Sequence, residues 1–334
     1  ALSKNTARER ALLLSAAGAG RMSPGHVDEA WHLIDESMVI AERLADPVVL
    51  GLALAGKGYG HRSCCEFEAA LAASEEALSL LNQGALWDRA DVLFSLSYSL
   101  YYLGRLSACD ARLPELQATA ARAGHHGAQW VHDLIHNAVA LARSGDIRAF
   151  RGRATPALAE SRARYFPRSF VGAASLYLGD VGPALEHLAG AVEEQPAEHW
   201  MQGMPEGNLL AATALAGHHE RARALIPSVI QRLPVTGRRN AHGAYLALDA
   251  FISGLTLMGD RDRCGALYPL TLDYIRTGQV FSALSFGPST PQLAAALAAD
   301  AAGLVEQSRE HFEMALRQAH EVPIRILQPT GVDG

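Results

Sequence analysis

A glycine recurs along this chain in a fixed local frame, and this frame constrains the fold more than any other feature of the sequence. Each copy reads glycine, a small residue five positions later, an apolar residue four further on, and a small or apolar residue three after that. A repeat period of about 34 to 47 residues is typical of stacked helix–turn–helix units. The copies are Gly25/Ala30/Ile34/Ser37, Gly104/Cys109/Leu113/Leu116, Gly145/Phe150/Ala154/Ala157, Gly179/Ala184/Leu188/Ala191, Gly217/Ala222/Ile226/Val229, Gly259/Cys264/Tyr268/Thr271 and Gly303/Ser308/Phe312/Ala315, with a degenerate copy near Gly60 (Ala70, Ser74, Ala77).

Each position of the frame has a mechanical reason. The glycine closes the first helix of a pair, because a left-handed residue is least costly without a Cβ. The small residue sits where the second helix crosses the first, and the next two frame residues share its helix face. One pair cannot bury that apolar stripe alone, whereas stacked neighbours can. The frame therefore predicts an all-α solenoid of antiparallel helix pairs.

The composition agrees with this prediction and excludes some functions. A chain of 334 residues exceeds one ordinary globular core, but the core of a solenoid extends linearly. Hydrophobic residues make up 49% and aromatic residues 7%, which favours closely packed helices over a sheet. The formal net charge is −6, so we expect no direct contact with nucleic acid or an anionic membrane.

The cysteines and the start of the chain bear on location. No cysteine spacing suits a zinc site or a disulfide framework, which indicates a reducing cytoplasm. No secretory signal opens the chain, and the most apolar stretch, 92–103, is too short to span a bilayer. The chain begins at Ala1 without an initiator Met, so we expect a fragment of a larger protein. The cysteines are Cys64, Cys65, Cys109 and Cys264.

The helical pattern predicts one domain over residues 1–334, made of a lead-in helix and about eight helix pairs. The longest irregular connection, 278–290, is the best candidate for a functional loop. The lead-in helix is expected over 6–17 and the next helix over 26–44. The pairs that follow are 48–59 with 66–82, 87–103 with 107–123, 127–143 with 147–163, 168–178 with 182–194, 199–216 with 219–232, 239–258 with 261–276, and 291–302 with 304–320.

Two resemblances follow from these residues. Ser308, Phe312 and Ala315 match the second helix of tetratricopeptide-like repeats. This resemblance implies a right-handed superhelix whose first helices line a concave surface that binds partners. No early tryptophan of the family's pattern is in register.

A narrower resemblance covers Gly259 to Arg325, through Gly259-Asp260, Ala266-Leu267-Tyr268, Phe286-Gly287-Pro288 and His311 to Leu316. This part is similar to the C-terminal helical region of large bacterial regulators. In these an AAA/STAND-type ATPase is joined to an adenylate cyclase or a LuxR-type DNA-binding module. The resemblance implies a cytoplasmic signalling or transcription-regulating protein whose catalytic and DNA-binding chemistry belongs to modules outside this chain.

Candidate binding residues follow from the concave offsets that the tetratricopeptide resemblance implies. Asp249 is a lone acid in an apolar helix, so it is either paired inside the stack or directed at a ligand. The Tyr98, Tyr101 and Tyr102 cluster offers rigid amphipathic contact surface. For each single residue, ordinary helix packing is the alternative. The predicted groove residues are Asp91, Tyr98, Tyr101, His132, Ser169, Asp249 and Ser253.

His132 and His136 stand one helical turn apart, a spacing that can chelate zinc. The intervening sequence resembles the zincin pattern except that Asp133 replaces the usual glutamate. A metal site needs three or four converging ligands, and no third ligand is evident. The alternative is that both imidazoles lie on a partly solvated groove face.

These observations leave three functional hypotheses. The leading one is a non-catalytic protein-interaction and regulatory-sensor module that binds a peptide or partner domain in its groove. The second is a receptor for a small-molecule effector, with a pocket between the 278–290 loop and the Asp249 helix. The third and weaker one is a metalloenzyme built on His132 and His136. No cofactor is expected, and the partner, the oligomeric state and the flanking modules stay open.

Overall fold

The computed structural model describes residues 4–23, 25–160, 165–196, 198–283, 289–322 and 324, with only the backbone at 4, 5 and 160. Within these ranges the chain forms α-helices and no β-strand; an isolated antiparallel bridge joins Ser282 and Ser289. The prediction of an all-α chain is confirmed. None of the helices in the described ranges is long and apolar enough to cross a membrane.

The chain divides into two compact units. The first unit comprises residues 1–136 together with the short segments 198–200 and 239–242. The second unit comprises 137–197, 201–238 and 243–334. The prediction of one domain over the whole chain stays a prediction, as does the right-handed sense of its superhelix.

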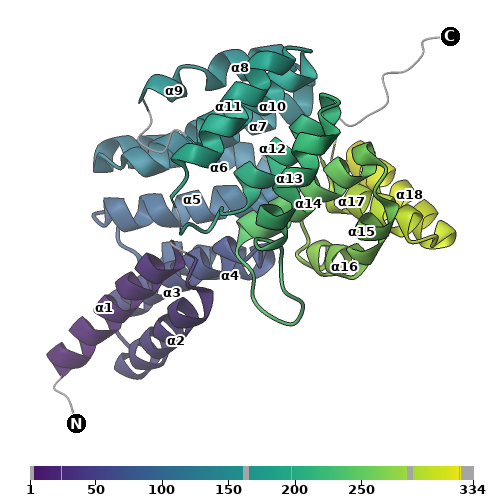
Figure 1. Cartoon of the computed structure of the whole chain (residues 1–334). Helices are drawn as coiled ribbons and strands as arrows, with labels where there is room; N and C mark the ends of the chain where they lie inside the picture. The colour runs from purple at the N-terminus through teal and green to yellow at the C-terminus, as the bar shows by residue number, and fades with distance from the viewer. Residues whose placement is uncertain are drawn as a thin grey trace. The chain divides into compact units, whose positions relative to one another are not determined.

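In the first unit the helices pack as successive pairs (Figure 1). Helices α1 and α2, α3 and α4, and α5 and α6 pack against each other, and α3 also contacts α1 and α5. This is the stacking that the glycine frame predicts. The helix expected as a lone lead-in is longer than predicted and is the first member of a pair with α2. The bounds are α1 Lys4–Met22, α2 Val27–Leu44, α3 Pro47–Ser63, α4 Phe67–Leu80, α5 Leu86–Tyr102 and α6 Leu106–Ala123; α7, His126–Ser144, begins in this unit.

The second unit continues the pairing through α10 with α11, α12 with α13, and α17 with α18. Two predicted second helices are broken, at Pro156 and before Pro269, because proline cannot donate the intrahelical hydrogen bond. The helix expected from 199 begins only at Met204, after Gly203. The bounds are α8 Ile147–Ala154, α9 Ala157–Glu160, α10 Tyr165–Tyr177, α11 Val181–Glu194, α12 Met204–Leu215, α13 His219–Ile230, α14 His242–Met258, α15 Arg261–Ala266, α16 Tyr268–Arg276, α17 Pro291–Ala301 and α18 Val305–Glu321.

All seven frame glycines adopt the left-handed conformation, with φ from 70° to 90°. After α5, Gly104 N–H donates to Tyr101 O at 3.0 Å and Arg105 N–H to Leu100 O at 2.9 Å, the pattern of a Schellman cap. In the degenerate repeat this place belongs to Cys65, with φ 61°, and not to Gly60, which lies within α3. The frame is therefore complete, with a cysteine in one glycine position.

The frame residues of the second helices are mostly buried, as the frame predicts. Ala30, Ala70 and Ala184 are each fully buried. Ala157, Tyr268 and Ser308 are partly exposed, and Phe312 on α18 is the most exposed, at 52%. No helix follows α18 in the described part of the chain, so no neighbouring pair covers this face.

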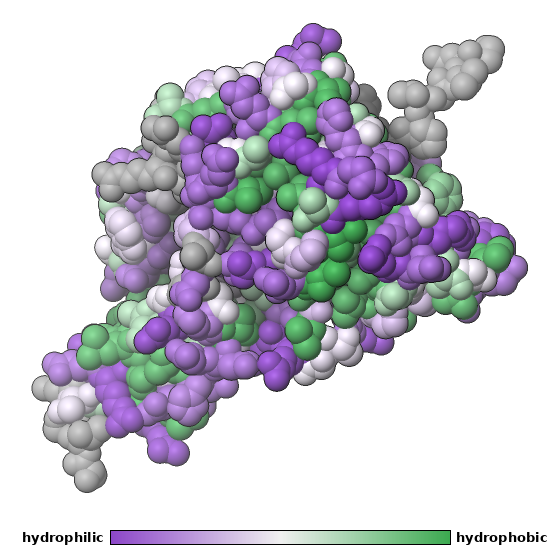
Figure 2. Space-filling model, viewed as in Figure 1, coloured by the Kyte–Doolittle hydropathy of each residue, from purple (hydrophilic) through white to green (hydrophobic). Residues whose placement is uncertain are grey.

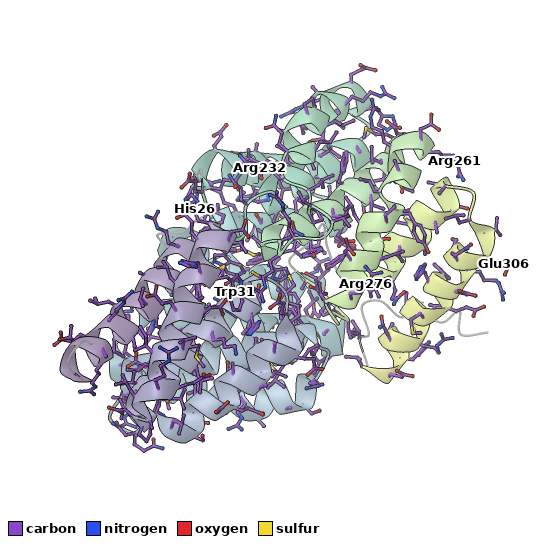
Figure 3. The ribbon with its side chains drawn as sticks, turned by 90° about the horizontal axis from the view of Figure 1, so that it is seen from below. His26, Trp31, Arg232, Arg261, Arg276 and Glu306 are labelled. Atoms are coloured by element: carbon purple, nitrogen blue, oxygen red, sulfur yellow. The ribbon has the colours of Figure 1, made fainter. Side chains whose placement is uncertain are left out.

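Surface character varies along the second unit. Figure 2 shows hydrophobic patches among hydrophilic side chains on the face that it presents. In the second unit, Leu215 of α12 and Ile230 of α13 are each 50% exposed. Seen from below, Figure 3 places Glu306 at the outer edge of α18. In the first unit, the same view places Trp31 among the helices, consistent with its 4% exposure.

Candidate functional site

A pocket of about 520 Å³ opens between α6 and α7 in the first unit. Its α6 wall is a single stripe, because positions spaced by three, four and seven residues share one helix face. The α7 wall carries the two histidines that the sequence singled out, with the aspartate between them. The lining residues are Asp110, Leu113, Pro114 and Gln117 from α6, and His132, Asp133 and His136 from α7.

The wall of the pocket is more apolar than polar, and its polar groups are two carboxylates, two imidazoles and an amide. The imidazole rings of His132 and His136 are 5.9 Å apart and 30° from parallel. His132 Nδ1 lies 2.8 Å from Asp133 Oδ1, and the Asp133 side chain remains 72% exposed. Carboxylates, imidazoles and an amide around Leu113 suit a polar or basic side chain of a ligand.

A metal ion bound by His132 and His136 would need a third ligand, and the described residues of this pocket do not supply one. In the described ranges, no three His, Cys, Asp or Glu side chains are grouped so that they could hold a metal ion. A zinc site needs at least three converging protein ligands. The metalloenzyme therefore stays the weaker alternative.

A second feature of the first unit is an aromatic cluster around Arg62, a fully buried residue of α3. Four aromatic rings face its guanidinium within cation–π distance. Trp200 reaches the cluster from segment 198–200, far away in the sequence. The distances from Arg62 Cζ to the ring centroids are 4.1 Å for Phe94, 4.6 Å for Tyr59, 4.9 Å for Trp200 and 5.2 Å for Tyr98.

The predicted tyrosines belong to this cluster and its surroundings. Tyr98 is 3% exposed and Tyr101 2%, so neither offers surface to a partner. Tyr98 Oη lies 2.9 Å from Nδ1 of His242, and burial raises the pKa of Tyr98. Phe67 stacks on Tyr102 at 5.2 Å. Tyr98 and Tyr101 lie in the core, which agrees with ordinary helix packing, the alternative to a role in binding.

The remaining predicted residues of the first unit are Asp91 and His132. Asp91 is half-exposed, and its Oδ1 lies 2.9 Å from Nε2 of His125. His125 in turn stacks on Trp87 with ring centroids 4.0 Å apart. His132 is the only residue of the predicted groove set that lines the pocket.

In the second unit, the predicted residues are tied to their own helices and neighbours. Ser169 is buried and donates to Tyr165 O at 2.9 Å. Asp249 is 2% exposed and accepts a 2.9 Å hydrogen bond from Ser289 Oγ. Ser253 donates to Asp249 O at 3.1 Å. Of the two alternatives for Asp249, the structure shows pairing inside the stack. In the predicted loop 278–290, residues 284–288 lie outside the described residues.

Sequence reasoning missed the α6 wall of the pocket and the centre of the aromatic cluster. The stripe of Asp110, Pro114 and Gln117 was readable from its helical spacing. Arg62 had no local signal, because its partners come from α5 and from segment 198–200 as well as from its own helix.

No family model matches the chain, and no curated protein matches it. Among solved structures, the chain is similar to one described as "Crystal Structure of Rap Protein Complexed with Competence and Sporulation Factor". The match has a TM-score of 0.57 and 12% sequence identity, and covers 88% of this chain and 81% of that chain. The likeness shows the fold alone: this chain has a tetratricopeptide-like helical-repeat fold.

Proposed function

We propose that this chain is a protein-interaction module, non-catalytic by itself, that binds a peptide or an extended segment of a partner protein. The observation that carries the proposal is the pocket between α6 and α7, which opens on a helical-repeat scaffold. In helical-repeat proteins each repeat packs only on its neighbours, and the stacked repeats form an extended surface that can bind a partner. The similar solved structure is, by its description, a complex with competence and sporulation factor.

The lining of the pocket defines the ligand class. Asp110 and Asp133 supply negative charge, and His132 and His136 add ring nitrogens. A lysine or arginine side chain of a peptide complements this set, with its aliphatic part against Leu113. We therefore expect a basic peptide as the ligand.

The first test is selection of peptides from a random library on the immobilised chain, followed by titration calorimetry. The selected peptides should carry a basic residue, and Asp133→Asn should weaken their binding about fivefold, or ~1 kcal/mol, through loss of one exposed charge. Because Asp133 is largely exposed, this substitution should leave the fold intact.

The matched control is Asp35→Asn, which removes an exposed carboxylate of α2 outside the pocket. It should bind the same peptide as the wild type does. Equal affinities of wild type, Asp133→Asn and Asp35→Asn would contradict the pocket assignment. Binding of a small metabolite in place of every peptide would favour the effector-receptor alternative.

We extend the proposal to a regulatory sensor within a larger cytoplasmic bacterial signalling or transcription-regulating protein. The support is the resemblance of 259–325 to the helical region of AAA/STAND-linked regulators. Ligand binding would then bias the packing of neighbouring repeats, which are coupled by direct contact. The coding sequence around this chain tests the extension: an ATPase, cyclase or DNA-binding module in the same reading frame supports it, and its absence contradicts it.

A further inference from the structure

Two arginines of the first unit are buried but differ in their partners. Arg89 donates through Nη1 to Leu78 O and Leu81 O at 3.3 and 3.2 Å, and its Nη2 lies 3.2 Å from Glu115 Oε1. For Arg62, Nε, Nη1 and Nη2 are all buried and find no hydrogen-bond partner among the described residues. Arg62 also takes part in no ion pair with another described residue.

The buried positive charge of Arg62 has lost its hydration, and the aromatic rings make up for that loss only in part. Arginine cannot lose its proton in a protein, so the positive charge stays in the core. Cation–π contacts attract the charge but accept none of its five N–H hydrogen bonds. Buried charges in proteins are paired, and a planar guanidinium matches an oxyanion through two parallel hydrogen bonds.

We propose that Arg62 is the anchor of a binding site for a small oxyanion, a carboxylate or a phosphate group, inside the aromatic cluster of the first unit. The rings of Phe94, Tyr98 and Trp200 exclude water and strengthen the ion pair. This site is distinct from the pocket between α6 and α7, none of whose lining residues belongs to the cluster.

Segment 198–200 covers the site and controls entry of the anion. Trp200 lies over Arg62 and is itself 8% exposed. Trp200 packs on Tyr98 and His242 as well as on Arg62. Its N–H donates to Ser23 O at 2.8 Å, and His26 Nε2 lies 3.2 Å from Glu198 Oε2 on the surface. Because residues 198–200 are not helical, we expect this segment, and no helix, to move when the anion reaches Arg62. Figure 3 labels His26, just before α2.

The experiment is thermal unfolding of the full chain in chloride, inorganic phosphate and acetate at equal ionic strength. The wild type should show a saturable rise of several degrees in its unfolding temperature with phosphate, with acetate or with both, and the effective salt identifies the class of anion. Arg62→Met should abolish this rise. In chloride it should unfold at the wild-type temperature or above, because an uncompensated buried charge is removed.

Arg89→Met is the matched control, since it removes a buried arginine that has partners. It should unfold several degrees below the wild type in chloride, yet keep the response to the anion. Asp133→Asn should also keep this response, which separates the site from the peptide pocket. A wild type that responds to neither anion, or an Arg62→Met variant that responds like the wild type, would overturn the proposal.

A second readout does not depend on the folding of a variant. Burial, and next the charge of Arg62, lower the pKa of His199 to about 4. A bound anion compensates that charge, so the pKa of His199 in the wild type should rise on addition of saturating anion, measured by NMR titration of its imidazole. A pKa that stays unchanged under those conditions would show that no anion reaches Arg62.

Discussion

At the scale of the residue, exposure decides which polar side chains serve the stack and which are free to meet a ligand. The sequence predicts Asp249 as a groove residue, and it singles out Asp133 only through the zincin-like spacing of its neighbouring histidines. Asp249 is 2% exposed and hydrogen-bonded to Ser289, whereas Asp133 is largely exposed beside the pocket. Spacing along a helix identifies a face, but it does not tell whether another element covers that face.

Asp249 should therefore matter for stability. Its replacement by Ala leaves the partly buried Ser289 hydroxyl without this acceptor and should destabilise the fold by about 1–3 kcal/mol. Ser253→Ala on the same helix removes only a hydroxyl that bonds the carbonyl one turn back, and should change stability by less than ~0.5 kcal/mol. Urea unfolding followed by circular dichroism measures both; equal losses for the two variants would contradict this account.

At the scale of the element, the turn residues keep successive helices in step. The glycine frame could be read from the sequence because every copy solves the same local problem, a left-handed residue that ends a helix. The glycine pattern does not reveal the turn at Cys65, because a cysteine occupies the glycine position there, although Ala70, Ser74 and Ala77 stand in register with it. The helix breaks at Pro156 and Pro269 were also readable, since proline ends the preceding hydrogen-bond ladder.

Two glycines of the second unit test the role of the turn glycines, because their replacement by alanine should change the free energy of unfolding in opposite directions. Gly217 has φ 78° and open space around an added Cβ, so Gly217→Ala should destabilise by about 1–2 kcal/mol through backbone strain alone. Gly152 lies within α8, also in open space, and Gly152→Ala should stabilise by roughly 0.5–1 kcal/mol. Thermal or urea unfolding checks the pair. Two changes of the same sign would contradict the role of Gly217.

At the scale of the whole molecule, the repeat frame predicts the fold but does not predict the candidate binding sites. A solenoid is specified by contacts between neighbours in sequence, which a single chain displays. The Arg62 cluster instead joins residues of α3 and α5 with segment 198–200, and His242 contacts Tyr98 from 144 positions further along the chain. No local sequence pattern predicts contacts between residues so far apart in the chain. The sequence pointed to one wall of the pocket, through the spacing of His132 and His136, because that wall is a single turn of α7.

The central claim is that the pocket between α6 and α7 receives a peptide. Hydrogen–deuterium exchange of the whole chain, with and without a peptide selected from the library, tests this claim most directly. Protection on binding should concentrate in 110–117 and 129–136, because bound ligand stabilises the helices that it contacts. Protection confined to the second unit, with these two segments unchanged by a bound peptide, would contradict it.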